Sequence, residues 1–272
     1  MPRRPTLSPS KITTYLACPV KYRWTYVDPR GKWLLRARPY YSFGLTLHKV
    51  LERFHDSEDK GVETLAQAVA AYDESWIDAG YASAEEMAEA YGDGKVIVET
   101  YVAAQLARPR VAKTLFVERT LRMSMGEFDL IGRIDRLDQM PDGTLRIVDY
   151  KSQRQTVTEE DVAADLAMGI YQLLVRAEFP GKPVEASIIA LKTGSEAVSA
   201  LTDEEAAEFA GDLQVLGREI LARDYLEIRP VAKSLCLDCD FVTLCREDPE
   251  FRAEVDAMTL SLEPAAPESP ES

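Results

Sequence analysis

Apolar residues recur with a helical period along the first part of the chain. Residues 8–26 predict a helix that Ser8 or Ser10 caps and that Pro19 interrupts, because proline cannot donate a helical backbone hydrogen bond. Residues 62–109 predict further helices, with a break at Gly92-Asp93-Gly94. Between these regions, another helix is predicted by an apolar stripe whose members are Phe43, Leu47, Val50, Leu51 and Phe54.

The pattern changes near Thr114, where apolar and polar residues begin to alternate as they do in β-strands. Helical periodicity returns over residues 158–179 and 202–223. This order of elements predicts an α/β or α+β core behind a helical N-terminal region. Four strands are predicted, over residues 114–123, 127–139, 145–151 and 184–192.

Length and composition narrow the class of protein. The 272 residues suffice for one large domain or two small ones, and 46% of them are hydrophobic. No run approaches the roughly 18 consecutive apolar residues of a membrane span, so the composition excludes a membrane protein and a wholly disordered chain. The basic N-terminus has no apolar stretch behind it, and we therefore expect a cytoplasmic protein.

Charge is distributed unevenly. The chain has 32 basic and 46 acidic side chains, a net charge of −14, which argues against a protein that coats nucleic acid nonspecifically. Residues 1–40 nevertheless carry nine basic side chains and one acidic one. We interpret the acidic residues 61–94 as a partner surface or as a solvated helix face. Aromatic residues in the basic segment either contact a single nucleic-acid strand or pack internally: Tyr15, Tyr22, Trp24, Tyr26, Trp33, Tyr40 and Tyr41.

The most informative stretch is GRIDRLDQMPDGTLRIVDYKS, residues 132–152. Its Pro141-Asp142-Gly143 turn lies between two alternating runs and predicts a β-hairpin. With a five-residue loop, Asp135 pairs with Asp149, and their Cβ atoms lie about 4.5–5.5 Å apart. Lys151 follows two residues later and therefore lies on the same face as Asp149.

Two facing carboxylates repel one another, and a divalent cation removes that repulsion. Mg²⁺ or Mn²⁺ takes hard oxygen ligands and keeps open water positions, while Lys151 can orient water and offset the charge of a phosphate. These groups suit hydrolysis of a phosphodiester. The alternative is an exposed hairpin whose charged residues only solvate one face.

The two histidines lie seven residues apart on one predicted helix. His48 lies at the edge of the apolar stripe, where a neutral imidazole either completes a metal site or serves as a structural histidine. His55 is followed by several acidic residues, and we interpret it as solvated surface.

The four cysteines fall into a group of three, in the pattern CxxCx5C, and one distant upstream residue. Four thiolates suit a tetrahedral zinc ion or an iron–sulfur cluster, and ordinary buried thiols are the remaining alternative. A shared metal group would fasten the basic N-terminal segment to the C-terminal segment. These residues are Cys18, Cys236, Cys239 and Cys245.

Five motifs together resemble the RecB-like branch of the PD-(D/E)XK nucleases, and specifically its iron–sulfur members, such as the AddB nuclease domain and the CRISPR-associated RecB-like exonucleases. The resemblance covers residues 8–246. It implies a restriction-endonuclease-like core, in which helices flank a central mixed sheet, with a helical N-terminal region and an iron–sulfur clasp. The motifs are, in order, SPSKITTYLACPVKYRW, FGLTLHKVLE, GRIDRLD, VDYKS and the cysteine group.

The resemblance also implies roles for individual residues. The metal ligands it implies are His48, Asp135, Asp149 and the backbone carbonyl of Tyr150. Asp135 and Asp149 are also implied to be catalytic, together with Lys151. Glu118 matches a frequently acidic position and receives a supporting role. The ligands of a [4Fe-4S] cluster, with Zn²⁺ as the alternative, are Cys18, Cys236, Cys239 and Cys245.

One helical motif departs from the family pattern. Tyr171 fits it in a supporting role, but the glutamine expected four residues earlier is Ala167, and Gln172 follows the tyrosine instead. The resemblance implies one nuclease domain over residues 1–246, followed by an acidic, disordered tail over residues 247–272. Within that domain we expect a helical region over 8–110, a nuclease core over 112–225 and the cysteine group over 236–245.

The resemblance implies a metal-dependent deoxyribonuclease, an exonuclease acting on DNA with single-stranded ends in DNA repair, recombination or a related process. The resemblance also implies a separately encoded helicase or repair-complex partner, because AddB-like nucleases work beside motors. The chain itself has no GxxxxGK[ST] motif of a nucleotide-driven motor. The alternative is a catalytically weak DNA-binding or scaffolding subunit of a repair or CRISPR complex.

Overall fold

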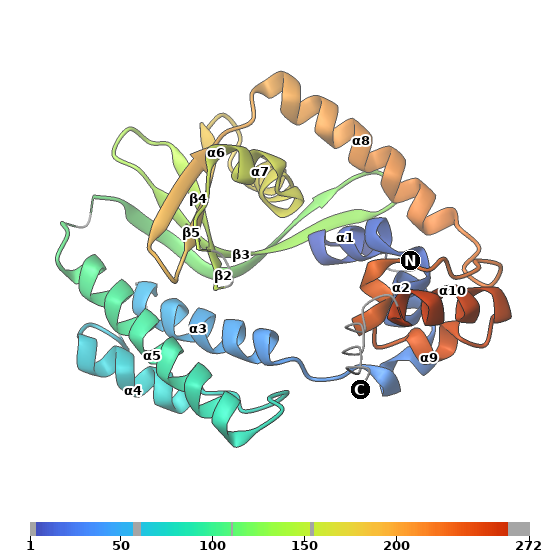
Figure 1. Ribbon diagram of the computed structural model, residues 1–272. Helices are drawn as coiled ribbons and strands as arrows, with labels where there is room; N and C mark the ends of the chain where they lie inside the picture. The colour runs from blue at the N-terminus through green and yellow to red at the C-terminus, as the bar shows by residue number, and fades with distance from the viewer. Residues whose placement is uncertain (1–3, 57–60, 110, 153–154, 261–272) are drawn as a thin grey trace, which may run out of the picture. The chain divides into compact units, whose positions relative to one another are not determined.

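The computed structural model describes residues 4–56, 61–109, 111–152 and 155–260. Figure 1 labels the main helices and strands. In chain order the elements are β1 (Thr6–Leu7), α1 (Pro9–Ala17), α2 (Pro19–Tyr22), the π-helix η1 (Arg23–Val27), the 3₁₀ helix η2 (Pro29–Leu34), α3 (Pro39–His55), α4 (Leu65–Ser75), α5 (Ala84–Leu106), β2 (Lys113–Ser124), β3 (Asp129–Gln139), β4 (Leu145–Lys151), α6 (Glu159–Ala164), α7 (Leu166–Glu178), β5 (Val184–Ala190), β6 (Ser195–Ser199), α8 (Asp203–Ala222), the 3₁₀ helix η3 (Ser234–Asp238), α9 (Val242–Cys245) and α10 (Pro249–Leu260).

The chain divides into two compact units. The first consists of residues 1–12 and 37–221 and contains the sheet; the second consists of residues 13–36 and 222–272 and contains all four cysteines.

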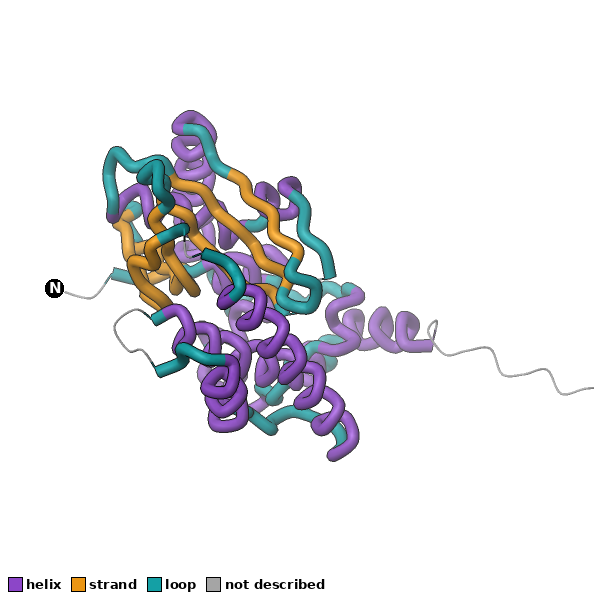
Figure 2. Tube along the Cα trace, turned by 90° about the vertical axis from the view of Figure 1, so that its left-hand side faces the viewer, coloured by secondary structure: helices purple, strands orange, loops and turns teal. Residues whose placement is uncertain are grey.

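The sheet of the first unit is mixed. β2, β3 and β4 form an antiparallel meander, β5 pairs in parallel with β4, and β6 returns antiparallel to β5. β1 adds a short parallel pair at the start of β3. The view in Figure 2 shows these strands as one twisted sheet. The α/β fold with helices around a mixed sheet agrees with the expected core.

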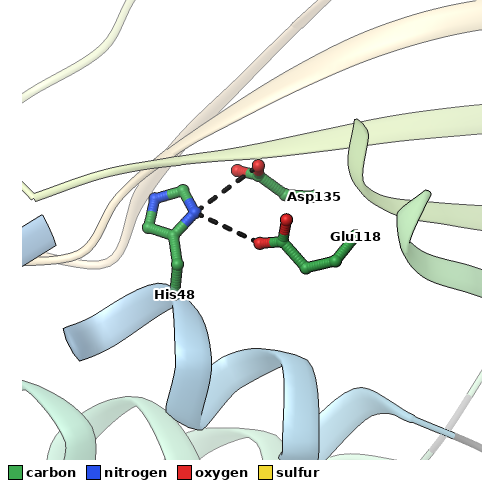
Figure 3. Close-up of side chains that lie close together, drawn as sticks. All are labelled: His48, Glu118 and Asp135. Carbon is green, nitrogen blue, oxygen red and sulfur yellow. Dashed lines mark ion pairs between the residues drawn. The ribbon is translucent and has the colours of Figure 1, made fainter. Parts of the chain in front are cut away.

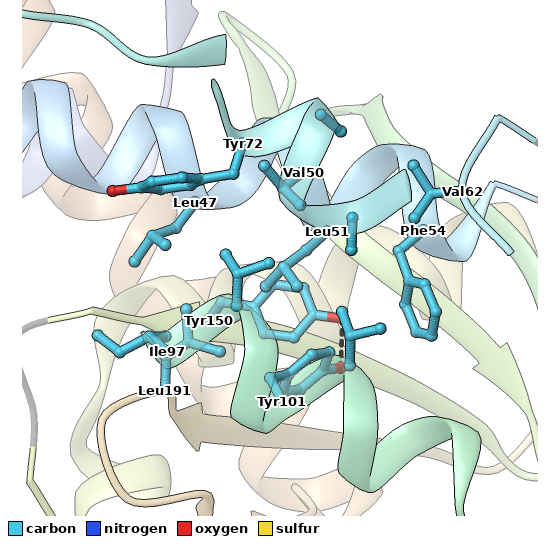
Figure 4. Close-up of a cluster of buried hydrophobic side chains, with 14 of the residues drawn as sticks. Leu47, Val50, Leu51, Phe54, Val62, Tyr72, Ile97, Tyr101, Tyr150 and Leu191 are labelled. Atoms are coloured by element: carbon cyan, nitrogen blue, oxygen red, sulfur yellow. Dashed lines mark hydrogen bonds between the residues drawn. The ribbon is translucent and has the colours of Figure 1, made fainter. Parts of the chain in front are cut away.

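Helices cover the sheet in the first unit (Figure 1). α7 packs against β2, β3 and β5. The apolar stripe of α3 is buried as predicted, and together with α4 and α5 it packs against side chains of β4 and β5 (Figure 4). The stripe therefore fixes the rotation of α3 about its axis, and this rotation decides where His48 points.

The predicted helix break at Gly92-Asp93-Gly94 is wrong. α5 runs through these residues without interruption, and the chain instead leaves the helical conformation between α4 and α5. A Cβ atom at Gly94 would collide with the Tyr72 hydroxyl and the Phe43 ring. Gly94 is thus explained by the close approach of two helices and not by a turn.

Other expected elements are confirmed with small differences. The four predicted strands correspond to β2, β3, β4 and β5, while β1 and β6 escaped prediction. The helix expected over 158–179 is divided into α6 and α7 at Asp165, whose carboxylate accepts hydrogen bonds from the backbone nitrogens of Ala167 and Met168. Asp165 therefore caps a new helix.

The second unit has two small apolar clusters. Val20, Trp24 and Phe241 form one, and Phe251 and Val255 of α10 form the other with Cys236. The acidic tail that we expected to be disordered from residue 247 therefore begins with a packed helix. Residues 261–272, the rest of that expected tail, lie outside the described residues.

Candidate active site

The β3–β4 hairpin has the predicted register. Gln139 pairs with Leu145 and Leu137 with Ile147, but the ladder ends at the next pair, Arg136 with Val148. The predicted ladder pair of Asp135 with Asp149 is therefore wrong. Beyond the ladder, Asp135 Oδ2 accepts a hydrogen bond from the backbone nitrogen of Tyr150, at 3.0 Å. The Asp135 carboxylate thus takes the place of a backbone carbonyl as the acceptor for the Tyr150 nitrogen. This happens where Asp135 and Asp149 would otherwise form the next pair of the ladder.

Lys151 lies between two carboxylates at the end of β4. Its Nζ atom lies 2.8 Å from Asp149 Oδ2 and 4.0 Å from Asp165 Oδ2. Asp149 is buried, whereas Lys151 remains partly exposed. Sequence reasoning missed Asp165, although an aspartate that begins a helix is a recognisable capping signal. Its role at the site depends on a contact with Lys151 that no local pattern reveals.

His48 projects from α3 toward two carboxylates (Figure 3). Its Nδ1 atom lies 3.4 Å from Asp135 Oδ1 and 3.6 Å from Glu118 Oε1. Its Nε2 atom lies 3.1 Å from the carbonyl oxygen of Tyr150. The potential ligand atoms of His48, Glu118 and Asp135 all lie within 4.8 Å of one another. The structure therefore brings together three of the implied metal-site groups and adds Glu118 to them.

Glu118 occupies this position through an unusual backbone conformation. Its φ angle is +47°, a value that non-glycine residues rarely adopt and that costs about 1–3 kcal/mol. Its neighbours in β2 pair with Ile134 and Arg136, which places Glu118 opposite Asp135. Arg133 Nε lies 2.5 Å from Glu118 Oε2. Sequence reasoning missed Arg133, whose exposed guanidinium partly neutralises the charge of Glu118.

The electrostatics of the site favour a bound cation. Burial first, and then the charge of Asp135, raises the pKa of Asp149 to about 6. Burial opposes a charged His48, but the carboxylates of Asp135 and Glu118 outweigh it and raise the pKa of His48 to about 10. Burial likewise opposes a charged Lys151, but Asp149 raises its pKa. An imidazolium thus occupies the middle of the carboxylates when no metal ion is bound.

The donor atoms present fit a hard divalent ion. Carboxylate and carbonyl oxygens with one imidazole nitrogen are ligands that Mg²⁺ and Mn²⁺ accept. Metal binding would require neutral His48, because a protonated imidazole has no lone pair to donate. Asp149 lies outside the tight group of His48, Glu118 and Asp135, and its nearest described charge is Lys151.

Tyr171 and Gln172 have different surroundings. The Tyr171 ring lies where a Cβ atom on Gly132 would be, and burial followed by nearby Asp149 and Asp135 raises the pKa of its hydroxyl. Tyr171 is thus close to the acidic residues of the site. Gln172 is buried, and its Oε1 atom accepts a hydrogen bond from the backbone nitrogen of Leu201. We conclude that Gln172 has a structural role, in which it links α7 to the backbone at Leu201. It does not replace the missing glutamine of the family motif.

His55 is not a solvated surface residue. Its Nε2 atom lies 2.7 Å from Nη1 of Arg136, and the same Nη1 atom donates to the Tyr150 hydroxyl at 2.6 Å. Arg136 Nε lies 3.0 Å from an Asp138 oxygen. His55 is half-buried, and its contact with Arg136 explains why the prediction of a solvated surface residue is wrong. This buried network contacts the side chain of the same Tyr150 whose carbonyl faces His48.

The four cysteines line one pocket in the second unit, together with apolar side chains that include Val20, Phe241 and Phe251. None of them forms a disulfide. Burial, followed by the proximity of the other three thiols, raises the pKa of Cys245 to about 12. Four mutually close thiols in an apolar pocket fit a metal group, since metal coordination removes the cost of placing thiolates together.

The chain is similar to a known protein family and to solved structures. A family model of the PD-(D/E)XK nuclease superfamily matches residues 6–246. A crystal structure from Eubacterium rectale, of a protein provisionally named an exonuclease, matches with a TM-score of 0.51 and 13% identity, over 89% of this chain and 88% of that one. A second crystal structure, of SSO0001, matches with a TM-score of 0.31 and 14% identity, over 75% and 84% of the two chains.

The search of curated proteins finds no match. Within the described residues, no helix combines the length and apolar character that crossing a bilayer would require.

Proposed function

Because the chain belongs to the PD-(D/E)XK nuclease superfamily and is therefore a phosphodiester hydrolase, we propose that it is a deoxyribonuclease that removes nucleotides from single-stranded ends of DNA. Nucleases of this superfamily use divalent metal ions. The observation that carries the proposal is the close approach of the His48, Glu118 and Asp135 side chains. Two of them, His48 and Asp135, contact the backbone of Tyr150, and Lys151 follows Tyr150 in β4.

The proposed ion is Mg²⁺ or Mn²⁺. We assign it to His48, Asp135, Asp149 and the Tyr150 carbonyl, with Glu118 as a supporting acidic group. When bound, such an ion stabilises negative charge on the phosphate and lowers the pKa of a water molecule. The unfavourable backbone conformation of Glu118 supports a role at the site, since strain of this kind persists where surrounding contacts hold it.

Lys151 is the proposed catalytic lysine. Its ammonium group, held between Asp149 and Asp165, can orient the attacking water and offset charge on the phosphate. Attack forms a bond from the water oxygen to phosphorus while the bond to the leaving nucleotide oxygen breaks. A proton leaves the attacking water and another reaches the leaving oxygen. Asp149 and Asp135 complete the catalytic set, and Tyr171 has a supporting role beside it.

The four cysteines are the proposed ligands of a [4Fe-4S] cluster with a structural role. All four line one apolar pocket, where a metal group would offset the cost of placing four thiolates together. A tetrahedral zinc ion is the alternative. Broad visible absorption after anaerobic purification would separate the cluster from Zn²⁺.

We further propose that residues 1–246 act as one nuclease domain in DNA repair, recombination or a related process. The second unit would then belong to this domain as the part that carries the cluster. In this proposal a separately encoded helicase or repair-complex partner would supply unwound DNA.

The experiment that tests the function compares linear and circular DNA. Anaerobically purified protein is incubated with Mg²⁺ or Mn²⁺ and with single-stranded or double-stranded DNA labelled at one end. An exonuclease shortens linear single strands and spares single-stranded circles, and the label lost first gives the polarity. Cutting of circles would contradict exonuclease action. DNA binding with no cutting under either metal ion would instead favour the scaffolding function.

A further inference from the structure

Trp33 is 90% exposed, the largest exposed fraction among the large hydrophobic side chains of the described residues. It lies near the end of η2 in the second unit, and it makes no hydrogen bond or ring contact with any described residue. An indole ring has a large apolar area, and its exposure to water forgoes the favourable free energy that burial of this area would give. A solvated tryptophan on a folded element is therefore a candidate contact residue.

The other aromatic side chains of the basic segment are less exposed than Trp33. Tyr15, Tyr22 and Trp24 are buried, and the two tyrosines pack on Tyr225. Tyr26, Tyr40 and Tyr41 are 40%, 44% and 63% exposed, but Tyr26 packs on the Tyr22 ring, and Tyr40 and Tyr41 pack on one another. Trp33 is the most exposed of these aromatics and the exposed indole of the second unit.

The backbone that carries Trp33 is held firmly. The neighbouring Leu34 packs against the cluster of Val20, Trp24 and Phe241. Asp28 caps η2 by accepting a hydrogen bond from the backbone nitrogen of Arg30 at 3.1 Å. A rigid support lowers the entropy cost of using Trp33 in binding.

Exposed cations surround the indole in sequence and belong to the same unit. Lys32 and Arg36 are exposed, and the Arg30 side chain is 69% exposed. Arg30 pairs with Asp28, and Arg36 pairs with Asp240, so Lys32 is the cation of this set without a described ion pair. The pairing of the two arginines keeps their positions defined while leaving much of each guanidinium open to solvent.

From these observations we propose that Trp33 is a stacking platform for one base of single-stranded DNA, with Lys32, Arg30 and Arg36 beside the phosphates of that strand. An aromatic face flanked by cations is the chemistry that binds unpaired nucleotides without sequence preference. A duplex does not fit as well, because its base faces are covered by their stacked neighbours. The positive charge of this segment, on a chain of net charge −14, favours a negatively charged partner such as the phosphate backbone of that strand.

This inference rests on the proposed function and names a substrate contact for it. Its test measures binding of oligothymidylate to the full chain in a buffer without divalent cations, so that no hydrolysis is needed. Comparison with Trp33→Leu assigns a change in tryptophan fluorescence to Trp33, since the other two tryptophans, the buried Trp24 and the partly buried Trp76, are present in both proteins. We expect oligothymidylate to change the emission of the wild-type protein and to leave that of Trp33→Leu nearly unchanged.

Substitutions separate stacking from general effects. Trp33→Leu should raise the dissociation constant for oligothymidylate at least about fivefold, and Trp33→Phe, which keeps a ring, should restore much of the loss. Leu226→Ala, which alters another exposed apolar side chain of the same unit, should bind as the wild type does. Lys32→Gln should lower the slope of log affinity against log salt by about 0.7, whereas Lys182→Gln, in the first unit, should not.

Three results would overturn the inference: equal affinity of Trp33→Leu and wild type, unchanged emission at saturating oligothymidylate, or tighter binding of a duplex or of oligouridylate. Failure of the nuclease function is distinguishable from these results. A wild-type protein that stacks oligothymidylate on Trp33 but never cleaves it supports this contact and contradicts the proposed function.

Discussion

The Oδ2 atom of Asp135 lies 3.0 Å from the backbone nitrogen of Tyr150 and accepts its hydrogen bond. This bond holds the end of β3 to β4 beyond the last ladder pair, and it leaves Oδ1 of the same carboxylate 3.4 Å from His48. Asp135 therefore combines a structural hydrogen bond with the chemical role that we propose for it, and the two can be separated by substitution.

Asp135→Asn keeps an oxygen that can accept the Tyr150 hydrogen bond but removes the charge. We expect thermal stability without metal to be close to that of the wild type, and metal-dependent cleavage to fall about 100-fold or more. Asp135→Ala should lose both the hydrogen bond and the metal-dependent cleavage, and loss of the hydrogen bond should lower the free energy of unfolding by about 1 kcal/mol or more. The measurements are thermal unfolding and initial cleavage rates. Wild-type cleavage by Asp135→Asn would show that the charge of Asp135 is not used.

The two glycines of α5 form a matched pair. Gly94→Ala places a methyl group against Tyr72 and Phe43 and should destabilise the protein by about 1–3 kcal/mol. Gly92→Ala meets no atom within 4 Å and should stabilise α5 by up to about 1 kcal/mol, because alanine favours helix. Denaturant unfolding measures both. Equal effects of the two substitutions would contradict the close helix packing at Gly94.

The buried network behind Tyr150 predicts a large cost for losing its cation. Arg136→Met removes the ion pair between Arg136 and the buried Asp138 carboxylate, and we expect a loss of about 3–5 kcal/mol. Arg133→Met removes an exposed charge and should change stability by less than about 1 kcal/mol. Chemical denaturation at neutral pH tests this difference. Similar losses for both variants would show that the network contributes little.

The metal group that we propose for the cysteine pocket predicts a local effect of its removal. Cys18→Ser or Cys245→Ser should abolish metal binding at the four thiols and make residues 13–36 and 222–260 more susceptible to protease. Cleavage sites within residues 61–109 should remain protected, because α4 and α5 belong to the first unit. Limited proteolysis with mass spectrometry locates the cuts. Unchanged protection in variants that contain no metal would contradict a structural role for the group.

Local signals in the sequence were sufficient for most of the sheet and for the hairpin. Alternation identified β2 to β5, and the Pro141-Asp142-Gly143 turn fixed the register of β3 against β4. The apolar stripe of α3 likewise predicted the buried face that orients His48. These features depend on residues close in sequence, so a single chain reveals them.

The remaining features depend on contacts between distant residues. Gly94 gave the same signal as a helix break, because only the position of Tyr72 reveals that the glycine allows close packing. Asp165 reaches Lys151, and Arg133 reaches Glu118, through the tertiary fold and a backbone conformation that the residue type of Glu118 disfavours. His55 looked solvated because its acidic sequence neighbours concealed its contact with Arg136.

The central claim is that the residues around Lys151 hydrolyse DNA, and the most direct test compares Lys151→Ala with Lys182→Ala. Lys182 is exposed and precedes β5 at the end where β5 pairs with Leu145, the opposite end of β4 from Lys151, so its variant controls for loss of a positive charge. With Mg²⁺ and end-labelled single-stranded DNA, we expect Lys151→Ala to cleave at least about 100-fold more slowly than wild type, with an unchanged unfolding temperature. Lys182→Ala should cleave at the wild-type rate. Wild-type cleavage by Lys151→Ala would contradict the account.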